Sequence, residues 1–392
     1  MSESRGDDEL GSAWNEFCDS LKSLGASVLA SPHARDEVST AEGMRHLARM
    51  VAMSLTQQID FTDSTDPRFF RSNDDVWQWG GPNVDNVYLG CPLDPSGTYR
   101  LMGDISGQPG AIMQVLGKPA AGDPIAVRAD RNLVELADAS GRVSIVLSGD
   151  PARDADVRLP ADAQRMIIRE YVPSRESRRA GFEIERLDVE PSALDLTSRR
   201  LVTSFASSRA WLAQNIAFWQ DYTSTRRDEV GINRIEPPSR GPGMGSESIA
   251  YCTGFYDLAD DECLVVTVDE PRARYWSIQL YSMGWYEALE VTKRQTSLNQ
   301  AQSHVDSDGK VRFVIGARDP GVPNWLDCGG HRQGMIHFRA VWCDELLGAT
   351  AEVVKSTELS RALPADHPVT TGEERSAALR ERRLLMQSRF AR

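Results

Sequence analysis

The side chains best suited to chemistry gather between residues 321 and 339, in the segment GVPNWLDCGGHRQGMIHFR. This segment begins as a glycine- and proline-rich loop and ends as an alternating strand. It supplies three candidate catalytic residues, Asp327, His331 and His337, and a nearby strand supplies a fourth, Tyr281. A carboxylate, imidazoles and a phenol can exchange protons near neutral pH when their surroundings shift their pKa values. The pattern therefore predicts general acid–base chemistry or polar-ligand binding.

Thiol chemistry is the first alternative, because Cys328 and His331 are three residues apart in a glycine-rich turn. A catalytic cysteine needs a base within hydrogen-bond reach and surroundings that lower its pKa. No wider cysteine-protease signature surrounds this pair. We therefore expect Cys328 to be a small, partly buried turn residue.

Metal and hydrolase chemistry are less well supported. His331 and His337 could join Asp327 or Asp319 in a nitrogen and oxygen site, but no H-E-x-x-H motif is present. No G-x-S-x-G serine motif occurs either, and the separation of carboxylates that glycoside hydrolysis requires cannot be derived from sequence. The sequence predicts no metal site and no cofactor.

Two strand-like runs carry a polar and an apolar side. In GMIHFRAVW, Ile336, Phe338, Ala340 and Trp342 alternate with His337 and Arg339, among others, so the two sets face opposite sides of a sheet. In RYWSIQLYS, the tyrosines and the glutamine likewise share one side. Tyrosine and arginine are enriched at recognition surfaces, so this polar side either lines a pocket or faces water.

A second group of polar residues suits loops. Asn324 and Asp327 can bind backbone amides that an irregular chain leaves without ladder partners, while Trp325 anchors the loop in a core. In GPNVDNVYLG, Asp85 can fix a turn or pair with Arg100 or Arg339. The full set of candidate ligand-binding residues is Tyr275, Gln279, Arg339, Arg332, Asn324, Trp325, Asp85 and Tyr88.

The elements that must position these residues follow from the change in hydrophobic period. Helical spacing near the N-terminus predicts a helical hairpin, with a capping box at STAE, Ser39 to Glu42. Period-two runs after residue 84, LVELAD among them, predict antiparallel sheets, and a helix returns at about 204–222. The fold is therefore predicted to be mainly β with flanking helices. The predicted parts are a helical hairpin at 1–62, a first β-sandwich at 63–200, a helix and Pro/Gly linker at 201–240, a jelly-roll-like sandwich at 241–372 and an arginine-rich terminal helix at 373–392.

The composition excludes several classes of protein. A net charge of −13 argues against a nucleic-acid partner, which requires clustered cations. No apolar run approaches the roughly 20 residues of a membrane span, and the acidic start MSESRGDDEL does not resemble a secretory signal. The six cysteines form no C-x-x-C pair, which is typical of reduced cytoplasmic thiols. We expect a cytoplasmic protein.

Three segments carry a family resemblance: GPNVDNVYLGCPLDPSGTYRLMG, YWSIQLYSMGWYEALEVTKRQTSLNQAQ and DPGVPNWLDCGGHRQGMIHFR. Together they resemble bacterial proteins of domain of unknown function 1214, and they are similar to the related domain of unknown function 1254. The resemblance covers most of the chain up to about residue 343, and it implies a double β-sandwich with no established reaction. In this family the position of Cys328 is more often threonine, which argues against an obligate cysteine nucleophile.

The functional expectation is a soluble enzyme or ligand-handling protein for a small hydroxyl- or carboxylate-bearing metabolite. The alternative is a non-catalytic carbohydrate- or lipid-binding module, or a subunit of a larger assembly. A homo-oligomer is compatible with either. If His337 and Arg339 line an open pocket, alanine substitutions there are expected to leave stability nearly unchanged.

Overall fold

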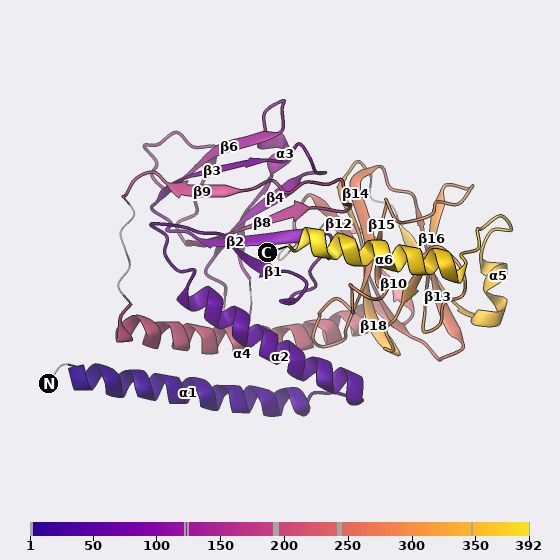
Figure 1. Cartoon of the computed structure of the whole chain (residues 1–392), viewed down its shortest axis with the longest axis horizontal. Coiled ribbons are helices and arrows are strands. Elements are labelled where there is room, and N and C mark those ends of the chain that lie inside the picture. The colour runs from indigo at the N-terminus through magenta and orange to yellow at the C-terminus, as the bar shows by residue number, and fades with distance from the viewer. Residues whose placement is uncertain are drawn as a thin grey trace. The chain divides into compact units, whose positions relative to one another are not determined.

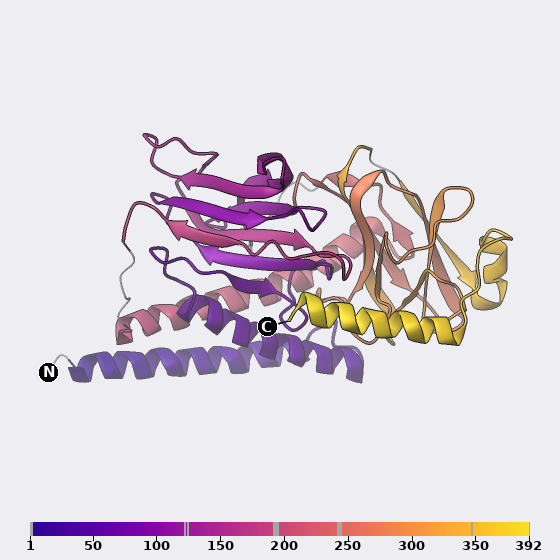
Figure 2. The same cartoon turned by 45° about the horizontal axis from the view of Figure 1, so that its top comes forward.

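The computed structural model describes residues 3–120, 123, 125–190, 196–240, 245–345 and 348–391. The chain forms two compact units, each assembled from separate stretches of sequence. Unit 1 comprises Met1–Trp79, Val87–Tyr171 and Arg178–Trp219, and unit 2 comprises Gly80–Asn86, Val172–Ser177 and Gln220–Arg392. Figures 1 and 2 show the elements of both units.

The helices are α1 (Glu3–Leu29), α2 (Glu37–Ile59), α3 (Leu133–Leu136), α4 (Ser198–Val230), α5 (Leu359–Ala362) and α6 (Gly372–Arg389), with a 3₁₀ turn η1 (Ser356–Glu358). The first strands are β1 (Phe70–Asn73), β2 (Asn86–Pro92), β3 (Thr98–Asp104), β4 (Ala111–Gly117), β5 (Val127–Asn132), β6 (Arg142–Ser148), β7 (Val157–Arg158), β8 (Ala163–Tyr171) and β9 (Glu183–Arg186). The later strands are β10 (Arg234–Ile235), β11 (Ser239–Arg240), β12 (Ile249–Asp257), β13 (Glu262–Asp269), β14 (Ala273–Tyr281), β15 (Ser297–Asn299), β16 (Lys310–Gly316), β17 (Trp325–Asp327), β18 (Gln333–Cys343) and β19 (Ala349–Lys355). The predicted class, several antiparallel sheets with a helical N-terminus and a central helix, is confirmed.

The helical hairpin of unit 1 consists of α1 and α2, which lie side by side (Figure 1). The N-cap of its second helix lies three residues before the predicted one. Asp36 is the N-cap, and its carboxylate accepts a hydrogen bond from the Ser39 amide while the Ser39 hydroxyl bonds back to the Asp36 backbone. The predicted capping serine is therefore wrong by three positions, because an aspartate upstream fills the same role.

Two sheets build the rest of unit 1, with strand orders β1-β2-β8-β4-β5 and β7-β6-β3-β9. One predicted strand is wrong: LVELAD forms the single turn α3. The Asn132 side chain accepts a hydrogen bond from the Val134 amide and donates to Glu135, so a local cap overrides the strand-like composition. The central helix α4 is longer than predicted, at 33 residues.

Two further sheets build unit 2, with orders β10-β12-β18-β14-β15 and β17-β16-β13-β19. Most pairs are antiparallel, while β16 and β17 are parallel. Alternate residues of β12, β14 and β18 share one apolar core with residues of β13 and β16, as expected for two packed sheets. The jelly-roll likeness of this sandwich stays a prediction.

The terminal helix α6 packs along the other elements of unit 2 (Figure 2). Three arginines seven residues apart, Arg375, Arg382 and Arg389, are buried on one face of it. Within the described residues, no helix is long and apolar enough to cross a membrane.

Candidate functional site

The two faces of β14 and β18 are divided as the alternation predicts. Ile336, Phe338 and Ala340 lie in the core of unit 2, together with Trp276 and Ile278 of β14. The alternation ends at the next core position predicted for β18. Trp342 has a left-handed backbone with φ 52°, and Cys343 takes the core place instead.

The opposite face is polar and buried. His337 pairs across the sheet with Gln279, and Arg339 pairs with Ser277. The exposed fraction is 3% for His337, 4% for Arg339 and 0% for Gln279. The polar face therefore does not face water, which excludes one of the two readings of the alternation. It also corrects the stability expectation, because removing His337 or Arg339 removes buried contacts.

His337 is the centre of an aromatic cluster on this face. The Tyr286 hydroxyl lies 2.5 Å from His337 Nε2, and the Thr253 hydroxyl lies 3.4 Å from Nδ1. Burial, with the nearby charges of Arg339 and Arg226, holds the pKa of His337 well below its usual range. Burial likewise raises the pKa of Tyr286 well above 10. At neutral pH the imidazole and the phenol of this hydrogen-bonded pair are thus both neutral.

Arg339 brings a positive charge next to this pair. Its guanidinium donates to the Tyr281 hydroxyl at 2.5 Å and to the carbonyl oxygen of Gly81 at 2.8 Å. The same group lies over the rings of Tyr251 and Tyr281, at 5.6 Å and 5.4 Å from their centroids. Such contacts between a cation and aromatic faces stabilise the charge away from water.

The segment Gly80–Asn86 closes this face within unit 2. The carbonyl oxygen of Pro82 accepts hydrogen bonds from Gln279 and Tyr281. Gly81 has φ +63°, and a Cβ at this position would lie 2.1 Å from the Tyr286 ring. Only glycine fits here, because the backbone is left-handed and the phenol occupies the space of a side chain.

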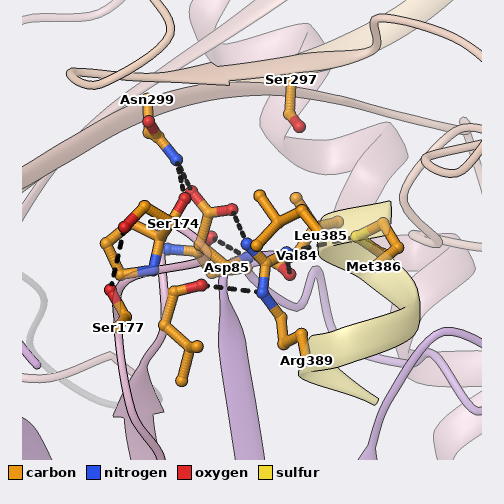
Figure 3. A network of polar contacts seen from close by, with 12 residues as sticks. Val84, Asp85, Ser174, Ser177, Ser297, Asn299, Leu385, Met386 and Arg389 are labelled. Carbon is orange, nitrogen blue, oxygen red and sulfur yellow. Dashed lines mark hydrogen bonds and ion pairs between the residues drawn. The ribbon is translucent and has the colours of Figure 1, made fainter. Parts of the chain in front are cut away.

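Asp85, in the same segment, is the centre of a second buried network (Figure 3). One carboxylate oxygen accepts from the Tyr275 hydroxyl at 2.8 Å and from Asn299 at 2.7 Å. The other oxygen lies 2.9 Å from the guanidinium of Arg389, which is 2% exposed. The arginines considered as possible partners of Asp85 were Arg100 and Arg339, and the structure places Arg389 there. Arg100 instead pairs with Glu185 on the surface of unit 1.

The loop before β18 is held by its polar residues, in the way its sequence indicates. Asn324 is fully buried, and its amide accepts from the backbone N–H of His304 and donates to the His304 carbonyl. Asp327 accepts from the Gly329 amide and from Arg294. The Trp325 indole donates to the Gly316 carbonyl. Trp325 and Asp327 form the ends of β17, which pairs with β16, and Asn324 lies directly before it.

Cys328 and its neighbours do not form a thiol site. Cys328 is buried in the core, and burial together with the Asp327 carboxylate raises its pKa to about 11. A thiol in this state carries little thiolate at neutral pH. His331 contacts Cys328 through the backbone, where its N–H donates to the Cys328 carbonyl.

The structure thus divides the predicted site residues into groups. His337, Arg339, Tyr281 and Gln279 come together on one face, and Tyr275 and Asp85 form the adjoining network in unit 2. Asn324, Trp325 and Asp327 stabilise the loop.

His331 precedes β18, and Arg332 is exposed and paired with Asp257. From the start of β18 to His337, four residues of extended chain measure roughly 13 Å. Tyr88 belongs to unit 1, where Arg169 lies 6.0 Å from its ring.

Sequence reasoning missed Tyr286, Tyr251 and Thr253. Thr253 pairs directly with His337 across β12 and β18, and Tyr251 pairs with Arg339. Their positions on β12 follow from the same alternation, so a strand register would have found them. Tyr286 follows β14 outside any strand and has φ 50°, for which no local sequence pattern was available.

Comparisons with known proteins agree with the predicted resemblance. Residues 258–345 match the family model described as "Protein of unknown function (DUF1214)". The resemblance to that family is confirmed. This span includes β14, the Asn324 loop and β18 but neither Asp85 nor Arg389. Among curated proteins, none matches the chain.

Solved structures support the fold. An uncharacterised protein from Burkholderia cenocepacia is 28% identical, with a TM-score of 0.81, and the similarity covers 90% of this chain and 99% of that one. A protein from Vibrio parahaemolyticus is 11% identical over 79% of this chain and 98% of that one, with a TM-score of 0.47. Neither description gives a reaction.

Proposed function

We propose that the chain is a cytoplasmic enzyme or ligand-handling protein for a small organic metabolite that carries a hydroxyl or carboxylate group. The observation that most supports this is the hydrogen bond between Tyr286 and the neutral, buried His337 beside Arg339. Side chains with shifted pKa values that are buried beside a specific charge are frequent at functional sites.

The chemistry of the cluster suits such a ligand. Arg339 presents a planar cation, which binds carboxylates through two parallel hydrogen bonds. His337 can accept a proton from a hydroxyl group, and Tyr286 can return one. Tyr281 and Gln279 add further hydrogen-bond donors on the same face.

Ligand entry requires a movement of the segment Gly80–Asn86. In unit 2 the carbonyl oxygens of Gly81 and Pro82 accept the hydrogen bonds of Arg339, Tyr281 and Gln279. The oxygens of a bound carboxylate or hydroxyl would take the places of these two carbonyls. The proposal therefore includes opening of this segment, which hydrogen exchange at its amides would detect.

Ligand-detected NMR with hydroxy acids, dicarboxylates and sugar acids as probes tests the proposal. We expect at least one of these classes to bind, and the binding to be lost in Tyr286→Phe and Arg339→Gln. Arg332→Gln is the matched control, because Arg332 is exposed at the end of the same strand. Retention of binding in all three variants would contradict the proposal, as would the absence of any binding. Binding of neutral sugars or fatty acids alone would favour the non-catalytic alternative.

A further inference from the structure

Three metal-ligating side chains of unit 2 converge outside the His337 cluster: His304, Asp306 and His367. One ring nitrogen of each histidine and one carboxylate oxygen lie within 4.8 Å of one another. His367 Nδ1 is 2.7 Å from Asp306 Oδ1, and His304 Nε2 is 3.4 Å from the same oxygen. The side chains of Asp306 and His367 are 2% and 3% exposed, and that of His304 is 36% exposed.

The backbone around the cluster is held by contacts that do not involve a ligand. The buried Asn324 side chain accepts a hydrogen bond from the N–H of His304 and donates one to its carbonyl. Asp306 begins a turn that Gly309 completes, with φ +75° at the glycine and a hydrogen bond from its amide to the Asp306 carbonyl. The ligand atoms are thus placed by the fold before any ion binds.

Arg312 orients the carboxylate. Its guanidinium donates to Asp306 Oδ2 at 2.6 Å, which leaves Oδ1 facing the two imidazoles. In metal sites the ligating carboxylates are themselves hydrogen-bonded by a neighbouring group, which fixes the lone pairs toward the ion. The contact with Arg312 has this arrangement.

A second observation concerns the outer nitrogen of His367. Its Nε2 atom is buried and has no hydrogen-bond partner in the described part of the chain. Buried polar atoms are nearly always paired, so this nitrogen is an exception that a bound water or ion would explain.

We propose that His304, Asp306 and His367 bind a first-row divalent cation, for which zinc is the best match. Two imidazoles and one carboxylate are a common protein ligand set for zinc, and a fourth position stays open for water. Because His304 is partly exposed, the open position lies toward solvent. The inference is independent of the proposed metabolite site, and it replaces the expectation that the chain has no metal site.

The distances in the cluster fit this assignment. Zinc–ligand bonds of about 2.0–2.2 Å place tetrahedral ligand atoms roughly 3.4 Å apart. The His304 nitrogen and the Asp306 oxygen already have this separation. Coordination through Nδ1 of His367 requires an opening of about 0.7 Å from its present contact with Asp306. Coordination through Nε2 would instead satisfy the unpaired atom, but Nδ1–H would then donate to Asp306, and the carboxylate would orient His367 rather than bind the ion.

Titration calorimetry on the full chain, stripped with a chelator and titrated with zinc chloride, tests the proposal. We expect one equivalent of zinc per chain. His304→Ala should weaken binding by at least tenfold, because loss of a ligand costs no less than loss of a group that orients one. Since the His304 ring is partly exposed, this variant retains the fold, which a circular dichroism spectrum checks. His331→Ala, which removes a histidine outside the cluster, should bind zinc with affinity unchanged within twofold.

The competing explanation is a His–Asp–Arg network that only stabilises the turn. Absence of saturable zinc binding, or equal affinity of the unchanged chain and His304→Ala, would overturn the metal proposal. Asp306→Asn gives a second readout, because it keeps the shape of the side chain and removes its charge. This variant should lose zinc binding, and zinc affinity equal to that of the unchanged chain would contradict the proposal.

Discussion

At the scale of single residues, Asn324 shows how a side chain in a chemically suggestive loop can serve the backbone. Its amide satisfies both polar groups of His304, twenty positions away in the sequence, from a fully buried position. Removing it leaves a buried donor and a buried acceptor without partners, and unpaired buried polar groups cost free energy.

We therefore expect Asn324→Ala to lower the free energy of unfolding by about 2–4 kcal/mol, the sum of the lost hydrogen bonds and a small cavity. Urea denaturation followed by tryptophan fluorescence measures this. Asn324→Asp places a buried carboxylate oxygen against the His304 carbonyl, so its loss is expected to be at least as large. A change below about 0.5 kcal/mol for the alanine variant, the usual effect of a surface substitution, would show that the two contacts contribute little.

His337 also makes the folding stability of the chain depend on pH. Its pKa in the folded chain is well below 6.5, whereas the unfolded chain has the ordinary value. As the pH falls below about 6.5, the unfolded state binds the proton first, so folded stability decreases. Above that pH both states are neutral at this residue and its contribution is constant.

The expected slope from this group approaches about 1.4 kcal/mol per pH unit between the two pKa values. Denaturation of the unchanged chain and of His337→Gln at pH 7.5 and pH 5.5 measures this contribution. All other titrating groups are the same in the two proteins, so the difference between their pH dependences belongs to His337. The variant should lose less stability on acidification. Identical losses in the two proteins would show that His337 is not buried in its neutral form.

At the scale of elements, α6 fastens the separate stretches of unit 2 together through its buried arginines. Arg375 binds Asp319, Arg382 donates to the carbonyls of Val291 and Ser297, and Arg389 donates to those of Val172 and Val84. Burial lowers the pKa of Arg382 to about 10. A period of seven residues brings these side chains to the same face, while the exposed arginines lie between them.

Arg389→Ala should lower the free energy of unfolding by about 3–5 kcal/mol, because it leaves the buried Asp85 carboxylate without its cation. The matched control is Arg380→Ala on the exposed side of the same helix, with an expected change within about 0.5 kcal/mol. Thermal and urea denaturation of the two variants compare them directly. Equal losses would show that the buried contact of Arg389 with Asp85 contributes little to stability.

At the scale of the whole molecule, the two units are not two continuous halves of the sequence. Unit 2 needs the short stretches Gly80–Asn86 and Val172–Ser177 in addition to residues 220–392. The first stretch supplies Asp85 and the carbonyls that cover the polar face, and the second supplies a carbonyl to Arg389.

A fragment of residues 220–392 should therefore fail to form the native sandwich. Without Asp85, the side chains of Arg389, Tyr275 and Asn299 lose a buried partner, each at a cost in stability. The dispersion of amide signals in an NMR spectrum and the cooperativity of thermal unfolding report on this. A fragment that unfolds cooperatively at the temperature of the full chain would refute the expectation.

The sequence by itself determined the features that depend on local periodicity. Alternation in β14 and β18 separated the core residues Ile336 and Phe338 from the polar His337 and Arg339, because side chains of a strand point to opposite faces in turn. Helical spacing likewise predicted the hairpin and the central helix. The strand predicted for LVELAD was wrong, because the Asn132 cap starts a helical turn there in spite of the strand-like composition.

Only the tertiary structure decided which polar residues meet. Val84 and Arg389 are 305 positions apart, and Asp306 and His367 are 61 apart. No periodic pattern links positions so far apart, since their contact depends on how sheets, turns and α6 pack rather than on the conformation of either segment. The same packing buried the polar face that alternation left undecided between pocket and solvent, because concavity and cover are properties of several elements together.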